Sequence, residues 1–430
     1  MLSRELARRF PLLYALATRH RVWLFGGVAL LFAATAYGRY IELILHSTGL
    51  VTKLGPMIGG DFLVFRTAGV VAGTPEIVRI YDMNYLSTVL QREFPGQGLK
   101  NFGWFYPPTM YLVVAPLARL PFTVGFVIWE TAFAGLLSVS LYAVWRDRRA
   151  LAFAMLSPVV LLAVMTGQTG MLTGSLLASG AYFADRRPIV AGVAIGLLTV
   201  KPQFGLLIPL AFLASRSWRA IAIASATSLA MAAISVVAYG MAPWRAFVDA
   251  MRTHGMRMQG SGFPLNKLIT PFGGLRAMGM SSDVAVWVQA ACTVLLAAYV
   301  ILVWARVKNS ALRVIALATA APLATPYAFY YELVILVIPM VLLARYAETH
   351  GWLKAELASL VLLWLVSFAP PGTDQLPAFP VSFAVAAMAF LVGARRVVPA
   401  AFQATRNTGR VVGDLRDDFH TAIPMTSLGT

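Results

Sequence analysis

Long apolar runs recur along almost the whole chain, from Val22 to Val392, and they limit the folds that are open to it. Inside lipid every backbone N–H and C=O must find a partner within the protein, so only helices and closed barrels can cross a membrane. A barrel would show segments of about 10 residues in which apolar and polar side chains alternate. These runs are continuously apolar instead. We therefore predict an all-α, polytopic membrane protein.

The composition agrees with a membrane location. Charged residues make up 12% of the 430 residues, roughly half the share in an average soluble protein. The formal net charge is +17. In short loops such charge sets the topology, and its excess favours anionic lipid headgroups, so membrane lipids are expected partners and nucleic acid is not. One cysteine allows no internal disulfide, and the histidines lack metal-ligand spacing, so we expect neither a metal nor another cofactor.

The positions of lysine and arginine predict the orientation. Positive loops stay in the cytoplasm, and alternation then predicts about twelve crossings, with both ends inside for a count of twelve. Two large polar loops, 46–106 and 241–283, would face the periplasm from the inner (plasma) membrane. We expect a monomer with a membrane domain over 1–396 and a flexible cytoplasmic tail over 397–430. Basic residues before the first span are Arg4, Arg8, Arg9, Arg19 and Arg21, and the predicted spans are 22–45, 122–145, 151–165, 171–184, 189–200, 204–214, 220–240, 284–304, 312–323, 333–344, 353–368 and 379–391.

The first outer loop contains GGDFLVFRTAG, in which Asp61 follows two glycines and precedes a short amphipathic segment. Asp61 can cap a helix, because a carboxylate there accepts hydrogen bonds from free backbone N–H groups, or it can act as a general base. Arg66 can pair with a carboxylate or meet a phosphate. Tyr81 and Asp82 follow in the same loop.

Polar residues also mark the later outer turns. Lys201 and Gln203 flank a proline between apolar runs, and Lys201 either snorkels from a helix end or binds a phosphate. Gln168, in TGQTG, serves a tight turn or a polar contact. His254 is an ordinary residue of the second outer loop or a phosphate contact. In the second crossing, Glu130 is expected to pair helices.

Two aromatic motifs complete the set. Tyr106 begins a proline-rich segment, where it can simply shape the chain. Tyr331 belongs to TPYAFYYELV, and tyrosines at this depth are typical anchors at the membrane interface. Glu332 is harder to explain in that way, because a carboxylate at the start of a span is costly.

Taken in order between the hydrophobic spans, these motifs resemble glycosyltransferase family 87, a GT-C-type family of polyprenyl-phosphate-sugar-dependent transferases that includes mycobacterial mannosyltransferases. The last motif of the family more often carries aspartate where this chain has Glu332, and the FPLNKL segment with Asn266 matches only in part. The matching pieces are DFLVFRTAG from Asp61, YD at Tyr81, FYPPTMYLVVAPLARLP from Phe105, GQTG at Gln168, the lysine–proline–glutamine turn at Lys201 and TPYAFYYELV from Thr325.

The resemblance implies a GT-C-like bundle in which Asp61 is the catalytic base. A mannose-like hexose would pass, with inversion, from a polyprenyl-phosphate donor to a lipid or glycan acceptor on the periplasmic face. Lys201 and Arg66 are the candidates for the donor phosphate. The other expected site residues are Tyr81, Asp82, Tyr106, Gln168, Gln203, His254, Tyr331 and Glu332.

Other functions remain open at this level. A transporter or lipid flippase predicts polar residues near the bilayer midplane and repeated halves, and the sequence has few of the former and no clear repeat. A non-catalytic scaffold would not need carboxylate and lysine motifs on one face. A pentosyl (arabinofuranosyl-like) transferase of the same fold would carry the same motifs.

Overall fold

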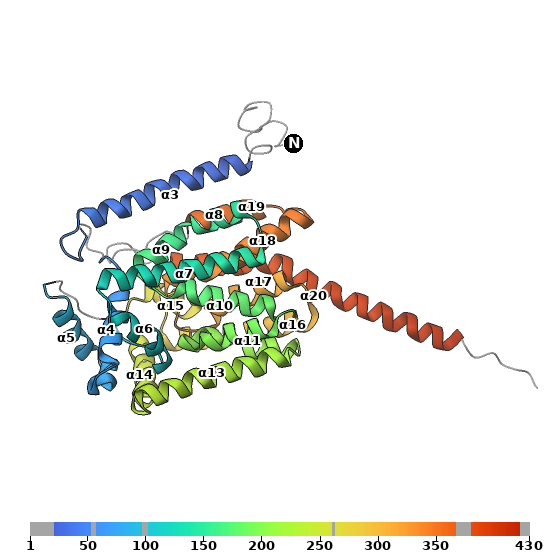
Figure 1. Cartoon of the computed structure of the whole chain (residues 1–430). Coiled ribbons are helices and arrows are strands. Elements are labelled where there is room, and N and C mark those ends of the chain that lie inside the picture. The colour runs from blue at the N-terminus through green and yellow to red at the C-terminus, as the bar shows by residue number, and fades with distance from the viewer. Residues whose placement is uncertain (1–20, 53–56, 97–101, 260–262, 367–379, 422–430) are drawn as a thin grey trace, which may run out of the picture.

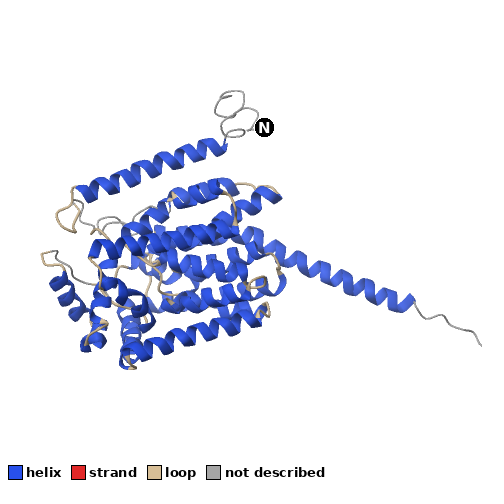
Figure 2. Ribbon diagram, in the orientation of Figure 1, coloured by secondary structure: helices blue, strands red, loops and turns tan. Residues whose placement is uncertain are grey.

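The computed structural model describes residues 21–52, 57–96, 102–259, 263–366 and 380–421. Arg4, Arg8, Arg9 and Arg19, and the outer turn expected at 370–377, lie outside these ranges. Every described element is a helix (Figure 2), and extended pairing is limited there to three isolated bridges. The prediction of an all-α chain is therefore confirmed for the described residues.

One group of elements comes from the two segments predicted as outer loops and from the proline-rich segment after the first of them. They are α4 (Phe62–Val71), η1 (Pro75–Tyr81), α5 (Met83–Glu93), η2 (Pro108–Met110), α6 (Tyr111–Ala118), α14 (Ala242–Gln259), η5 (Leu265–Lys267) and α15 (Pro271–Ala277). The remaining elements are α3 (Arg21–Leu45), α7 (Phe122–Val144), α8 (Arg148–Met155), α9 (Pro158–Thr166), α10 (Gly170–Phe183), α11 (Pro188–Leu197), η3 (Leu198–Val200), η4 (Pro202–Gly205), α12 (Ile208–Ala214), α13 (Trp218–Tyr239), α16 (Ser282–Arg306), α17 (Ser310–Ala324), η6 (Tyr330–Leu336), α18 (Val337–His350), α19 (Glu356–Val366) and α20 (Val381–Thr421).

The long helices run side by side (Figure 1). At one end of the bundle α4, α5, α6 and α14 lie together, whereas α20 extends beyond the opposite end. The two segments predicted as outer loops meet there, because α14 packs against η1. The rings of Tyr81 and Phe247 are 6.2 Å apart across this contact. Both loops can therefore contribute to one site.

Among the described residues, five helical segments are long and apolar enough to cross a membrane: Phe122–Val144, Trp218–Tyr239, Ser282–Arg306, Tyr330–His350 and Val381–Gln403. The pair α8 and α9 makes a sixth if it counts as one span bent by 51°. These helices indicate a multi-pass membrane protein, while twelve crossings stay a prediction. Most other expected spans are helical but short, because proline and glycine interrupt their apolar runs, as Pro158 does at the start of α9.

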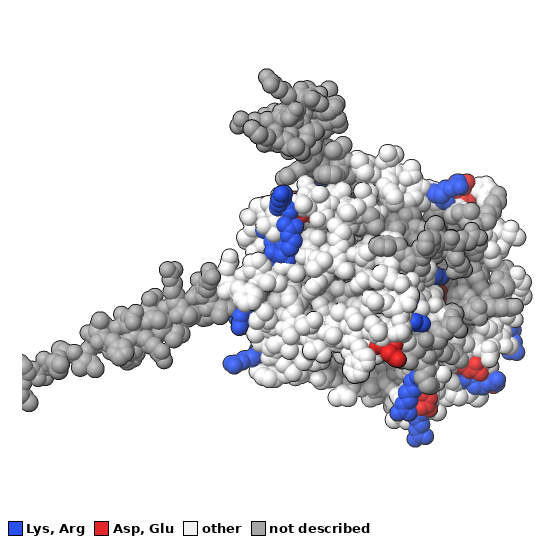
Figure 3. Space-filling model, turned by 180° about the vertical axis from the view of Figure 1, so that it is seen from behind, with Lys and Arg blue, Asp and Glu red and all other residues white. Residues whose placement is uncertain are grey.

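The surface fits this assignment. On the face shown in Figure 3, lysine, arginine, aspartate and glutamate gather toward the two ends of the molecule, and the described part between them is almost free of charge. The helix α20 continues without a break from Val381 to Thr421, past the domain boundary predicted at 396. That boundary and the flexibility of the tail stay predictions.

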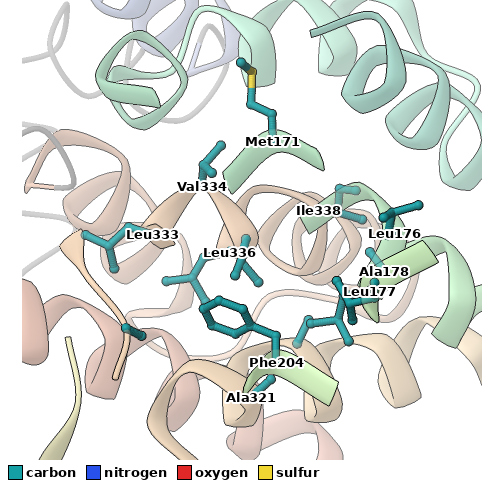
Figure 4. Packing of buried hydrophobic residues seen from close by; sticks show 14 of the residues in the cluster. Met171, Leu176, Leu177, Ala178, Phe204, Ala321, Leu333, Val334, Leu336 and Ile338 are labelled. Atoms are coloured by element: carbon teal, nitrogen blue, oxygen red, sulfur yellow. The ribbon is translucent and has the colours of Figure 1, made fainter. Parts of the chain in front are cut away.

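One part of the apolar core lies where α10 meets η6 and the start of α18 (Figure 4). Leu176 and Leu177 of α10 face Leu336 and Ile338, and Phe204 closes the cluster from the neighbouring turn. All five side chains are buried. This packing fixes η6 relative to α10, and both elements carry polar residues at their N-terminal ends.

Two glycines allow α11 and α13 to approach closely. A Cβ atom on Gly192 would lie 2.9 Å from the carbonyl oxygen of Ala220, and one on Gly196 would lie 2.9 Å from that of Ala224. Small residues spaced four apart on facing helices are typical of membrane helix pairs, because backbones can then touch.

Gly196→Val should therefore destabilise the protein by about 1–3 kcal/mol, the usual cost of overpacking. Gly135→Val is the matched control, because a Cβ atom on Gly135 of α7 would meet nothing within 4 Å. Thermal unfolding of both purified variants in detergent measures the difference. Equal unfolding temperatures for the two variants would contradict the close α11–α13 contact.

Candidate active site

Two glycine loops touch through their backbones and set the position of Asp61. The backbone N–H of Asp61 donates to the carbonyl oxygen of Thr166 at 2.8 Å. Gly60 has φ +46°, and a Cβ atom there would lie 2.6 Å from the carbonyl carbon of Thr166. Gly167 ends α9 with φ +61°, and its Cβ atom would lie 2.9 Å from the backbone nitrogen of Phe62. The residue after Gly167 consequently lies beside Asp61.

The Asp61 carboxylate does not cap the helix that it precedes. Asp61 occupies the N-cap position of α4, but its side chain makes no capping hydrogen bond, so the capping interpretation is wrong. Instead, Oδ2 of Asp61 accepts a hydrogen bond from Nε2 of Gln168 at 2.5 Å. The amide of Gln168 is held from its other side, where Oε1 accepts from the hydroxyl of Tyr106 at 3.1 Å and from the backbone N–H of Thr169 at 3.3 Å. Gln168, which is 4% exposed, thus orients the carboxylate.

The surroundings of Asp61 favour proton uptake. Burial raises the pKa of Asp61 above its ordinary value of 3.8. The hydrogen bond from Gln168 and the positive charges of Lys201 and Lys267 act in the opposite direction but do not cancel the rise. A carboxylate with a raised pKa is a stronger base, which is the change that a general base needs.

Lys201 and Glu332 form a buried ion pair, in which Nζ of Lys201 donates to Oε1 of Glu332. Their side chains are 5% and 1% exposed. The same ammonium donates to Oγ1 of Thr169 at 3.0 Å and lies 5.4 Å and 5.7 Å from the ring centres of Tyr106 and Tyr331. The snorkelling interpretation of Lys201 is therefore wrong, because the ammonium points inward. Burial lowers the pKa of Lys201, but the Glu332 carboxylate and the Tyr106 phenol together more than offset this, and the pKa is raised.

These contacts connect four segments into one network, from Asp61 through Gln168 and Thr169 to Lys201 and Glu332. The segments are the start of α4, the turn between α9 and α10, the turn between η3 and η4, and the first turn of η6. A fifth segment supplies the Tyr106 hydroxyl to Gln168. The backbone of that segment is held in turn by the Tyr81 hydroxyl, which donates to the carbonyl oxygen of Tyr106 at 3.0 Å.

Two expected site residues have other partners. Arg66 pairs with Glu93, its Nη1 lying 2.6 Å from Oε2, so the structure shows the carboxylate-pairing alternative. Asp82 is exposed and caps α5, accepting from the backbone N–H of Asn84 at 2.9 Å. Neither contact involves the network around Asp61.

The other two expected residues lie on η4 and α14. Gln203 is half-buried in η4, and its side chain makes no hydrogen bond within the described part of the chain. His254 lies on α14, but its side chain is outside what the structure describes. Across the described ranges, no group of three or more histidine, cysteine, aspartate or glutamate residues could hold a metal ion.

Thr169 and Lys267 were not predicted as site residues from the sequence. Thr169 joins the Gln168 turn to Lys201, and the TGQTG motif was its only signal. Lys267 belongs to the segment predicted as the second outer loop, which docks beside the network. Leu268 bridges to Phe329, and the next backbone N–H donates to Ala328 at 2.9 Å. Its signal was the FPLNKL segment.

Comparison with known proteins gives one match. The family model of glycosyltransferase family 87 matches residues 104–326, more than half of the chain. The match includes Tyr106, Gln168 and Lys201, whereas Asp61 and Glu332 lie outside it. A search of curated proteins and a search of solved structures each gave no match.

The buried ion pair predicts a strong coupling between its two residues. Lys201→Met should cost about 3–5 kcal/mol of stability, because Glu332 would be left buried without its counter-charge. Glu332→Gln should cost a similar amount, since it strands the ammonium. The double variant should be more stable than the sum of the two losses predicts. Unfolding of all four proteins of this cycle measures the coupling, and additive losses would contradict a direct pair.

Proposed function

The chain belongs to glycosyltransferase family 87, and from this premise we propose that it moves a mannose-like hexose from a polyprenyl-phosphate donor to a lipid or glycan acceptor. Membership makes it a glycosyltransferase, and its apolar helices indicate a location in the membrane. The observation that carries the proposal is the Asp61 carboxylate, which does not cap its helix and is oriented by Gln168. A base held in this way suits the activation of a hydroxyl.

In the proposed reaction, Asp61 takes the proton of an acceptor hydroxyl. The oxygen attacks the anomeric carbon from the face opposite the phosphate, and the configuration inverts. The bond between that carbon and the phosphate oxygen breaks, and its electron pair leaves with the lipid phosphate. Cations near the leaving oxygen would stabilise the charge that develops there.

The two cations expected for this task are both engaged. Lys201 could reach a donor phosphate only by loosening its contact with Glu332, and Arg66 only by leaving Glu93. As part of the proposal, Lys201 keeps the Gln168 turn in place through its hydrogen bond to Thr169. Lys201 thus has two possible roles, binding the donor phosphate and holding the Gln168 turn. Substitution of Lys201 distinguishes them, because loss of the first would weaken use of the donor and loss of the second would lower stability.

We also propose that the site faces the periplasm from the inner membrane. The helix α7 begins beside the site, where the Phe122 ring lies 5.6 Å from that of Phe62. It ends at Val144, just before Arg146, Arg148 and Arg149. Because arginine-rich links stay in the cytoplasm, the site would lie on the other side.

Asp61→Asn should lower transfer by about 10²–10⁴-fold, the usual contribution of a general base, without unfolding the protein. Asp82→Asn is the matched control, because asparagine also caps helices and Asp82 lies outside the network. Purified protein in liposomes would be given labelled polyprenyl-phosphate mannose and a panel of other polyprenyl-phosphate sugars, pentoses included. Near-normal transfer by Asp61→Asn would remove Asp61 from the proposal. Transfer of pentose alone would reassign the sugar.

The rate should also depend on pH through Asp61. A base must be deprotonated, so activity should fall as the pH drops through the pKa of Asp61, which is raised above 3.8. Gln168→Leu removes a hydrogen bond that lowers this pKa, so the acidic limb should move to higher pH. A profile of kcat against pH for the two proteins measures the shift. An unchanged limb would show that a different group titrates.

A further inference from the structure

The network has too little positive charge to receive a phosphate. Lys201 contributes one positive charge, and Asp61 and Glu332 each contribute a negative one when ionised. The Lys201 charge is already matched by its contact with Glu332. A donor phosphate brought beside this cluster would therefore face a net negative charge, and repulsion is strong where water is excluded.

Lys267 is the cation near Asp61 that keeps its charge available. Burial raises the pKa of Asp61 overall, but two positive charges, those of Lys201 and Lys267, act to lower it. Lys201 is buried, whereas Lys267 is exposed. Within the described ranges, the Lys267 side chain has neither an ion pair nor a hydrogen bond. An ammonium that is already in water and has no partner can meet an anion without first breaking a contact.

The backbone around Lys267 is held against the network. Lys267 ends η5, and its N–H donates to the carbonyl oxygen of Pro264 at 3.0 Å. The next residue, Leu268, bridges to Phe329, three residues before Glu332. The Phe329 ring is stacked on the Tyr331 ring at 5.5 Å, and the latter lies beside the Lys201 ammonium. The base of the Lys267 side chain is thus fixed beside the first turn of η6, while the residue is exposed to solvent.

We propose that Lys267 binds the phosphate of the lipid donor, and that Lys201 acts as a positioning residue inside the network. This assignment rests on the proposed glycosyl transfer. When the bond from the anomeric carbon to the phosphate oxygen breaks, the electron pair moves onto that oxygen, and Lys267 balances the resulting charge. Asp61 holds the proton from the acceptor hydroxyl. One lysine thus serves the leaving group, and the other maintains the geometry around the base.

The test compares two lipids that differ only in the phosphate. Binding of polyprenyl phosphate and of the uncharged polyprenol would be measured with wild-type protein, Lys267→Met, Lys267→Arg and Lys308→Met in detergent. Lys308 is the matched control, an exposed lysine in the link between α16 and α17. Lys267→Met should weaken binding of polyprenyl phosphate by roughly 10–100-fold, the range for a charge-assisted hydrogen bond, and leave binding of polyprenol unchanged. Lys267→Arg should retain most of the preference for phosphate, and Lys308→Met all of it.

A second readout excludes a merely structural effect. Loss of the Lys267 charge should move the acidic limb of the rate profile to higher pH, because that charge lowers the pKa of Asp61. Wild-type phosphate preference in Lys267→Met, in a protein that transfers sugar normally, would overturn the Lys267 assignment and leave the proposed function standing. A wild-type protein that neither transfers sugar nor prefers the phosphate lipid would overturn the proposed function, and the assignment with it.

Discussion

The site depends on a contact between two stretches of backbone. Gly60 and Gly167 let the loop before α4 lie directly on the end of α9, closer than any side chain would allow. The indole of Trp129 secures this contact from α7, donating to the carbonyl oxygen of Gly167 at 3.1 Å. Once these backbones meet, Gln168 can reach Asp61, and Thr169 can reach Lys201. The chemistry of the site is therefore set by two residues that carry no functional group.

The ionisable groups of the network divide into two environments. Lys201 and Glu332 are almost fully buried and satisfy one another, although Oε2 of Glu332 has no hydrogen-bond partner among the described residues. Asp61 is half-buried and shares its carboxylate with the neutral amide of Gln168. An amide can fix the direction of a carboxylate without neutralising it, so the base remains reactive. In a buried ion pair, by contrast, each charge is neutralised by its partner, so the pair mainly fixes the geometry of the site.

Much of the architecture could be predicted from the sequence, because it follows from local patterns. Continuous apolar runs gave the helical class, and motif order gave the family. The number of membrane spans was harder to predict from the sequence. Prolines and glycines divide several apolar runs into short helices, and the arrangement of these helices depends on packing. The role of Asp61 was also hidden. Its local pattern favours capping, and the partner that prevents it, Gln168, is 107 residues away. In the same way, a lysine at a helix end snorkels unless a distant carboxylate draws it inward.

The separation of Lys201 from Glu332 has a consequence for how the protein is made. The two residues lie 131 positions apart, so the lysine leaves the ribosome long before its counter-charge. An unpaired ammonium is costly in hydrocarbon. Until η6 is synthesised, the Glu332 carboxylate is not available to stabilise Lys201 in the interior. The network can close only after α18 inserts behind η6. Completion of the site is thus a late step in biogenesis, and a chain that stops before residue 332 would carry the lysine without the carboxylate that holds it inside.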